Sequence, residues 1–112
     1  MDRSYYLGYE YFKAACKGKL IEVEINGERF KYFLMSHETL RTFGRVNIRA
    51  CAVSDAVPKR FHPIVAYHEY VEGKTRSHKK AVKAELEAAR ELGLEREHHD
   101  WITTQDGQAN RF

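Results

Sequence analysis

The spacing of the hydrophobic residues changes near Pro58. In the stretch before it, residues such as Ile21, Val23 and Ile25 alternate with polar neighbours, which is the period of a β-strand with one buried face. After it, hydrophobic residues recur every three or four positions, which is the period of an amphipathic helix. This change from a period of two to a period of 3.6 predicts an α+β domain in which helices pack across one face of a sheet.

The sheet is predicted to begin with a hairpin. The two alternating runs in LIEVEINGERFKYFLM are separated by Asn26-Gly27, a dipeptide that is typical of tight turns between antiparallel strands. Ser36 can cap a short turn of helix over HETLRTF, and VNIRACAV (46–53) is rich in β-branched residues at its ends, as strands are. We therefore expect a three-stranded antiparallel sheet.

The second half of the chain is predicted to form a helical hairpin. A helix over 61–72 should end at Gly73, and a helix over 78–92 should begin after the capping residue Ser77. The link between them is short, so the two helices should lie side by side and antiparallel. The segment LEREHHDWI (94–102) has helical spacing and predicts a short C-terminal helix.

The N-terminal segment is predicted to form a helix of its own over 2–17. Its stripe of Tyr5, Tyr9, Phe12 and Cys16 has helical spacing. The stretch YYLGYEYF carries more aromatic surface than one helix face can bury, which favours a packing partner. We therefore expect a homo-oligomer, most simply a two-fold dimer, formed through this helix.

Composition limits the class of protein. A chain of 112 residues with 43% hydrophobic content can bury one core, so we expect a single domain over 1–112 with a frayed tail at about 107–112. It shows neither a secretory signal nor an apolar run long enough for a membrane span, which makes a cytoplasmic location the expectation. Cys16 and Cys51 are too far apart in sequence to suggest a thiolate zinc site or a disulfide framework.

Four ionisable residues of the helical hairpin fall on apolar helix faces: His68, Glu72, His78 and Glu85. Burial of an unpaired charge costs several kcal/mol, roughly, so each of them needs a partner. In an antiparallel hairpin all four can meet near the turn. Two readings stay open, a structural network of hydrogen bonds between the helices and a site for zinc or another divalent metal, because imidazole and carboxylate groups serve both.

The run AYHEYVE resembles the active helix of the zincin metallopeptidases. The resemblance implies that His68 is a zinc ligand and Glu69 the general base, with Glu72 in the place of the second histidine. Glu85 lies on a following helix that resembles the one supplying a glutamate ligand in the gluzincin branch. The pattern His-Glu-x-x-Glu, followed by a histidine and a further glutamate, also resembles that of small microbial and phage proteins without an established activity.

If the protein is an enzyme, the resemblance implies a zinc-dependent, metallopeptidase-like hydrolase. A carboxylate ligand in place of histidine adds negative charge and makes a bound zinc a poorer Lewis acid. We therefore do not expect an active peptidase.

A different function is also open, that of an interaction or nucleic-acid-binding module. The turn of the helical hairpin, residues 74–80, concentrates basic residues, and the start of the helix after Ser77 suits a phosphate. The candidate nucleic-acid contacts are Lys74, Arg76, Lys79 and Lys80.

Overall fold

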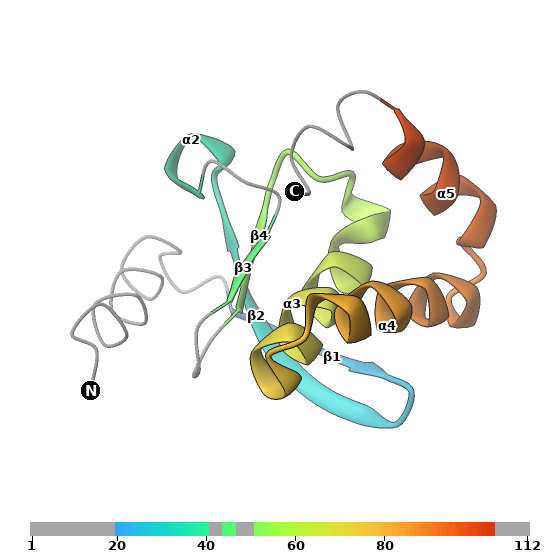
Figure 1. The fold of residues 1–112 in the computed structure, drawn as a ribbon. Coiled ribbons are helices and arrows are strands. Elements are labelled where there is room, and N and C mark those ends of the chain that lie inside the picture. Colours follow the sequence, from blue (N-terminus) through green and yellow to red (C-terminus); the bar gives the residue numbers. More distant parts are fainter. Residues whose placement is uncertain (1–19, 41–43, 47–50, 105–112) are drawn as a thin grey trace.

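A computed structural model of the chain describes residues 20–40, 44–46 and 51–104 (Figure 1). The predicted N-terminal helix over 2–17 and the predicted frayed tail lie outside these residues. The described strands are β1 (Leu20–Ile25), β2 (Glu28–Met35), β3 (Gly44–Val46) and β4 (Cys51–Ser54). The described helices are α2 (His37–Leu40), the 3-10 turn η1 (Lys59–Phe61), α3 (His62–Thr75), α4 (His78–Glu91) and α5 (Glu95–Thr103).

The β1–β2 hairpin forms as predicted. The two strands are antiparallel, with Leu20 opposite Phe33 and Ile25 opposite Glu28. Asn26 and Gly27 both have positive φ, 53° and 76°, as a two-residue turn that follows the twist of the strands requires. The α+β class and the hairpin that opens the sheet are thus confirmed.

The rest of the sheet differs from the prediction. It has four strands in the order β1-β2-β4-β3, and β2 pairs with β4 in parallel while β3 pairs with β4 antiparallel, so the sheet is mixed. The run predicted as one strand over 46–53 contains the last residue of β3 and most of β4. Hydrophobic alternation does not encode strand direction, and the segment between Met35 and Cys51 is long enough for a crossover that makes β2 and β4 parallel.

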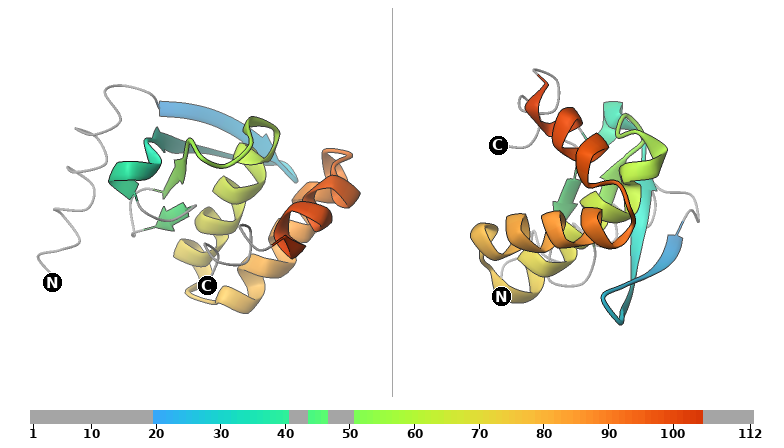
Figure 2. Two further views of the ribbon diagram at one scale, coloured as in Figure 1. Left: turned by 90° about the horizontal axis from the view of Figure 1, so that it is seen from above. Right: turned by 90° about the vertical axis from the view of Figure 1, so that its right-hand side faces the viewer.

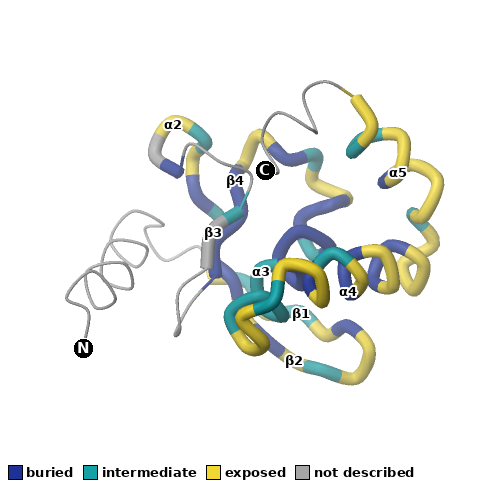
Figure 3. The backbone as a smooth tube through the Cα atoms, in the orientation of Figure 1, coloured by how far each residue is buried: buried dark blue, intermediate teal, exposed yellow. Residues whose placement is uncertain are grey.

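Helix α3 is the centre of the fold. It contacts β3 and β4 on one side and α4 on the other, so that the sheet, α3 and α4 form successive layers (Figures 1 and 2). Six of the first seven residues of α3 and all of β4 are buried (Figure 3). The core between sheet and helices includes Ile25, Phe30, Val53, Phe61 and Ile64.

The turn of the helical hairpin brings the end of α3 close to the start of α4. Helix α3 continues past Gly73, where the sequence predicted its end, and stops when Arg76 adopts a left-handed conformation with φ 57°. The N–H of Arg76 donates to the carbonyl of Glu72 at 2.7 Å, and the Ser77 hydroxyl then accepts the N–H of Lys80 as the cap of α4. This tight connection places Glu72 and His78 at the same end of the hairpin.

Candidate metal centre

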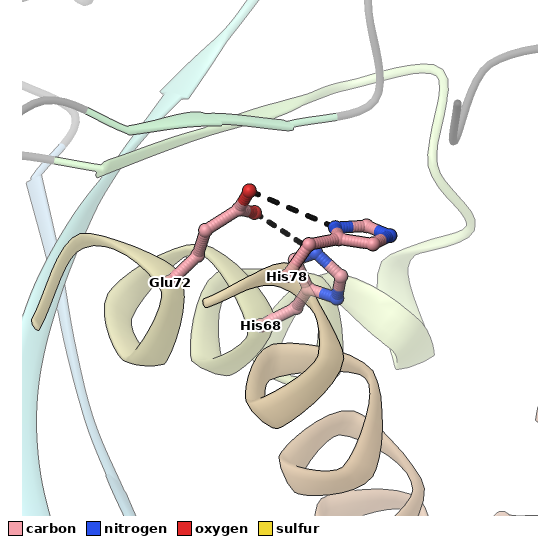
Figure 4. Close-up of side chains that lie close together, drawn as sticks. All are labelled: His68, Glu72 and His78. Atoms are coloured by element: carbon pink, nitrogen blue, oxygen red, sulfur yellow. Dashed lines mark ion pairs between the residues drawn. The ribbon is translucent and has the colours of Figure 1, made fainter. Parts of the chain in front are cut away.

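Three of the predicted side chains come together at this turn: His68, Glu72 and His78 (Figure 4). His68 and Glu72 are one helical turn apart on α3, and His78 is the first residue of α4. The distance from His68 Nε2 to Glu72 Oε2 is 3.2 Å, and that from His78 Nδ1 to Glu72 Oε1 is 3.6 Å. One atom of each residue can be chosen so that all three lie within 4.8 Å of one another.

These separations suit a small divalent ion. Bonds of about 2.0–2.2 Å from zinc to nitrogen or oxygen, at tetrahedral angles, place neighbouring ligand atoms roughly 3.3–3.6 Å apart. The two measured separations are close to that range, each to a different oxygen of Glu72, and one atom from each of the three residues meets the limit of 4.8 Å. Within the described residues, His68, Glu72 and His78 are the group whose ligand atoms lie close enough together to hold a metal ion.

The candidate centre is closed on one side and open on the other. The side chain of His68 is 6% exposed, that of Glu72 32% and that of His78 45%. Structural zinc sites have four protein ligands, whereas three ligands and access to solvent leave a coordination position for water or another small ligand. The arrangement is therefore that of an open site.

Glu85 lies near this group but on the other side of His68. Its Oε1 accepts a hydrogen bond from His68 Nδ1 at 2.6 Å, whereas the Nε2 of the same ring faces Glu72. The two nitrogens of an imidazole point in diverging directions, so Glu85 does not face an ion held by Nε2. The structure thus divides the predicted set of four into three candidate ligands and one hydrogen-bonding partner.

A second histidine, His98 on α5, also forms a hydrogen bond with Glu85. Its Nε2–H donates to Glu85 Oε2 at 2.5 Å. His68, Glu85 and His98 are all buried, with exposures of 5%, 1% and 0%. The sequence analysis did not connect His98 to the cluster, although the helical stripe of Leu94, His98 and Trp101 in LEREHHDWI was a signal that it faces inward.

One buried carboxylate cannot balance two imidazolium charges. His68 lies between Glu85 and Glu72 and can therefore carry a positive charge, while the carboxylate that His98 meets among the described residues is that of Glu85. Burial, followed by the positive charge of His68, lowers the pKa of His98 from 6.5 to about 4. His98 is thus a neutral donor at neutral pH.

Glu69 lies beside the edge strand β3. A Cβ atom placed on Gly44 would be 2.7 Å from Glu69 Oε1 and 2.8 Å from its Cγ, so this side chain fits only because residue 44 is a glycine. Burial raises the pKa of the Cys51 thiol to about 12, and the negative charge of Glu69 contributes to that rise. The glutamate that the zincin resemblance makes a general base is thus half-buried against the sheet.

The contact between Gly44 and Glu69 can be tested with a pair of substitutions. Gly44→Ala should lower the free energy of unfolding by about 1–3 kcal/mol, because the added methyl group overpacks this contact. In a Glu69→Ala background, Gly44→Ala should leave the free energy of unfolding unchanged. Chemical denaturation of the unmodified protein, the two single variants and the double variant measures the difference. Equal costs in both backgrounds would show that the two residues are not coupled.

The predicted basic surface lies around the same turn. Lys74, Arg76, Lys79 and Lys80 are all exposed. Lys74 Nζ donates to Glu28 Oε1 at 3.3 Å, and this hydrogen bond raises the pKa of Lys74. One of the four residues is therefore already paired with the β1–β2 hairpin, and nucleic-acid binding by this surface stays a prediction.

Compared with protein-family models, with curated proteins and with solved structures, the chain has no match in any of the three. None of the helices in the described part of the chain is both long enough and apolar enough to cross a membrane.

Proposed function

We propose that this protein binds a divalent transition-metal ion through His68 Nε2, the Glu72 carboxylate and His78 Nδ1. Two imidazoles and one carboxylate form a ligand set that suits zinc, and also manganese or iron. Zinc is the first ion to test, because it tolerates the three-ligand arrangement with one open position.

The observation that carries this proposal is the hydrogen bond between His68 and Glu85. A histidine that ligates a metal through one nitrogen usually donates its other N–H to a carboxylate or carbonyl, which fixes the tautomer and the ring orientation. Glu85 accepts from Nδ1 at 2.6 Å inside the core. With a proton held at Nδ1, Nε2 is the nitrogen whose lone pair an ion could use, and it lies 3.2 Å from Glu72 Oε2.

The open position would allow a bound water, and hydrolysis is the chemistry that such a water supplies on zinc. Two features of this chain argue against proteolysis. Glu72 adds a negative charge where zincins have a neutral histidine, which weakens zinc as a Lewis acid. Glu69 is packed against Gly44, and its use as a general base would disturb that contact. We therefore propose metal binding without peptidase activity.

Metal content and metal-dependent stability test the proposal together. Protein purified without a histidine tag should contain about one equivalent of metal by elemental mass spectrometry. After chelation, zinc at about 100 times its dissociation constant should stabilise the fold by about 2.7 kcal/mol, because an ion that binds only the folded state shifts the folding equilibrium. Differential scanning calorimetry would record this as a rise in melting temperature.

A matched pair of histidine substitutions provides the control. His78→Ala removes a candidate ligand whose side chain is 45% exposed, and His99→Ala removes a histidine whose side chain is 68% exposed and lies outside the group. The zinc-induced rise should disappear in the first variant and persist in the second. A rise that survives His78→Ala, or that is absent from the unmodified protein, would contradict the proposal.

A further inference from the structure

We infer that His98 is a positioning residue of the metal centre, acting through Glu85 on the ring of His68. The inference rests on the proposed function and extends it to α5, which supplies no candidate ligand. It is carried by a chain of two short buried hydrogen bonds, from His98 Nε2 to Glu85 Oε2 and from His68 Nδ1 to Glu85 Oε1.

Each oxygen of Glu85 accepts one of these two hydrogen bonds. The carboxylate is held from two sides, by α3 through His68 and by α5 through His98, and it is itself 1% exposed. A carboxylate fixed in this way cannot rotate about its last bond without breaking a buried hydrogen bond. Its Oε1 therefore stays where it accepts the Nδ1–H of His68, and the Nε2 of that ring keeps its direction.

In the described part of the chain, the side chain of His98 makes its hydrogen bond to Glu85. Within the described residues its Nδ1 has no hydrogen-bond partner. The ring packs edge-on against Phe61, with centroids 5.8 Å apart, and lies beside Trp101 at 6.1 Å. A leucine would fill this apolar space without leaving Nδ1 unsatisfied, so packing alone does not call for a histidine. The hydrogen bond to Glu85, in contrast, requires a donor at this position, and the Nε2–H of His98 supplies it.

Loss of that donor should weaken metal binding without touching a ligand. In His98→Leu, Glu85 loses the donor that holds Oε2, so the carboxylate is free to turn away from its present position. Loss of such an outer-shell partner typically lowers metal affinity by about 10- to 100-fold. Glutamine places an N–H close to the position of the histidine Nε2, so His98→Gln should restore most of the affinity.

The experiment compares zinc dissociation constants, measured by competition with a chromophoric chelator, in the full-length chain and three variants. We expect His98→Leu to bind zinc about 10- to 100-fold more weakly, and His98→Gln and Trp101→Phe to stay within about threefold of the unmodified protein. Trp101→Phe disturbs the packing of α5 but leaves the two hydrogen bonds. Equal affinity of His98→Leu and the unmodified protein, or an equal loss in Trp101→Phe, would overturn the inference.

A spectroscopic measurement on metal-free protein separates this inference from the proposed function. Long-range ¹⁵N–¹H NMR spectra should show a protonated Nε2 and an unprotonated Nδ1 for His98, and a slowly exchanging Nδ1 proton on His68 that is lost in His98→Leu and kept in His98→Gln. If the unmodified protein showed these signals but bound no zinc, the proposed metal binding would be wrong. His98 would then hold Glu85 in place for the stability of the fold alone. A proton on His98 Nδ1 in place of Nε2 would overturn the inference by itself.

Discussion

Replacement of Glu85 by alanine should lower the free energy of unfolding by about 3–5 kcal/mol in metal-free protein. Glu85 is 1% exposed and accepts hydrogen bonds from two buried histidines, so its removal takes the acceptor away from two buried N–H donors. At about 4–8 °C per kcal/mol for a domain of roughly this size, the melting temperature should fall by at least 12 °C, roughly. Thermal unfolding followed by circular dichroism, with a chelator present, measures this fall in melting temperature.

Two further substitutions make this result specific. Glu87 is an exposed glutamate on the same helix, and Glu87→Ala should change stability by no more than about 0.5 kcal/mol. Glu85→Gln keeps the shape but places an amide donor opposite one of the two histidine N–H groups, so it should cost about 1–3 kcal/mol. A loss in Glu85→Ala that is no larger than in Glu87→Ala would show that the buried network contributes little to the fold.

Parts of the fold that follow from local chemistry could be predicted from the sequence. The β1–β2 hairpin depends on two adjacent residues with positive φ, and Asn26-Gly27 is a sequence that tolerates both. The helical hairpin depends on a cap and a short link, and Ser77 provides the cap. The meeting of His68, Glu72 and His78 followed from the same link, because it fixes which ends of the two helices are neighbours.

Parts that depend on tertiary structure could not be predicted. The period of two predicts a strand but carries no information on its direction, so the parallel pairing of β2 and β4 was missed. A helical projection shows that Glu85 faces inward, but it does not show which nitrogen of His68 it meets. The partnership of Glu85 with His98 depends on how α5 packs beside α4, which no local pattern encodes.

Acidification should destabilise the protein through His98. The pKa of this histidine is lowered to about 4 in the folded state, whereas the ordinary value of 6.5 applies when it is exposed by unfolding. Between these two values the unfolded chain binds a proton that the folded protein does not, so the free energy of unfolding falls as the pH falls. At 1.36 kcal/mol for each pKa unit, His98 alone should account for a loss of about 3 kcal/mol between pH 7 and pH 4.

His98→Gln isolates this contribution, because it removes the titrating group and keeps a donor for Glu85. Other groups that titrate in the same range, among them His62, whose pKa is lowered by burial, are present in both proteins and largely cancel in the comparison. Denaturant unfolding in the presence of a chelator at several pH values should therefore give a steeper decline below pH 6.5 for the unmodified protein than for His98→Gln. Parallel curves would mean that His98 takes up its proton as readily in the folded protein as in the unfolded chain. That in turn would require Glu85 to support both imidazolium charges, against the charge balance inferred for His68, Glu85 and His98.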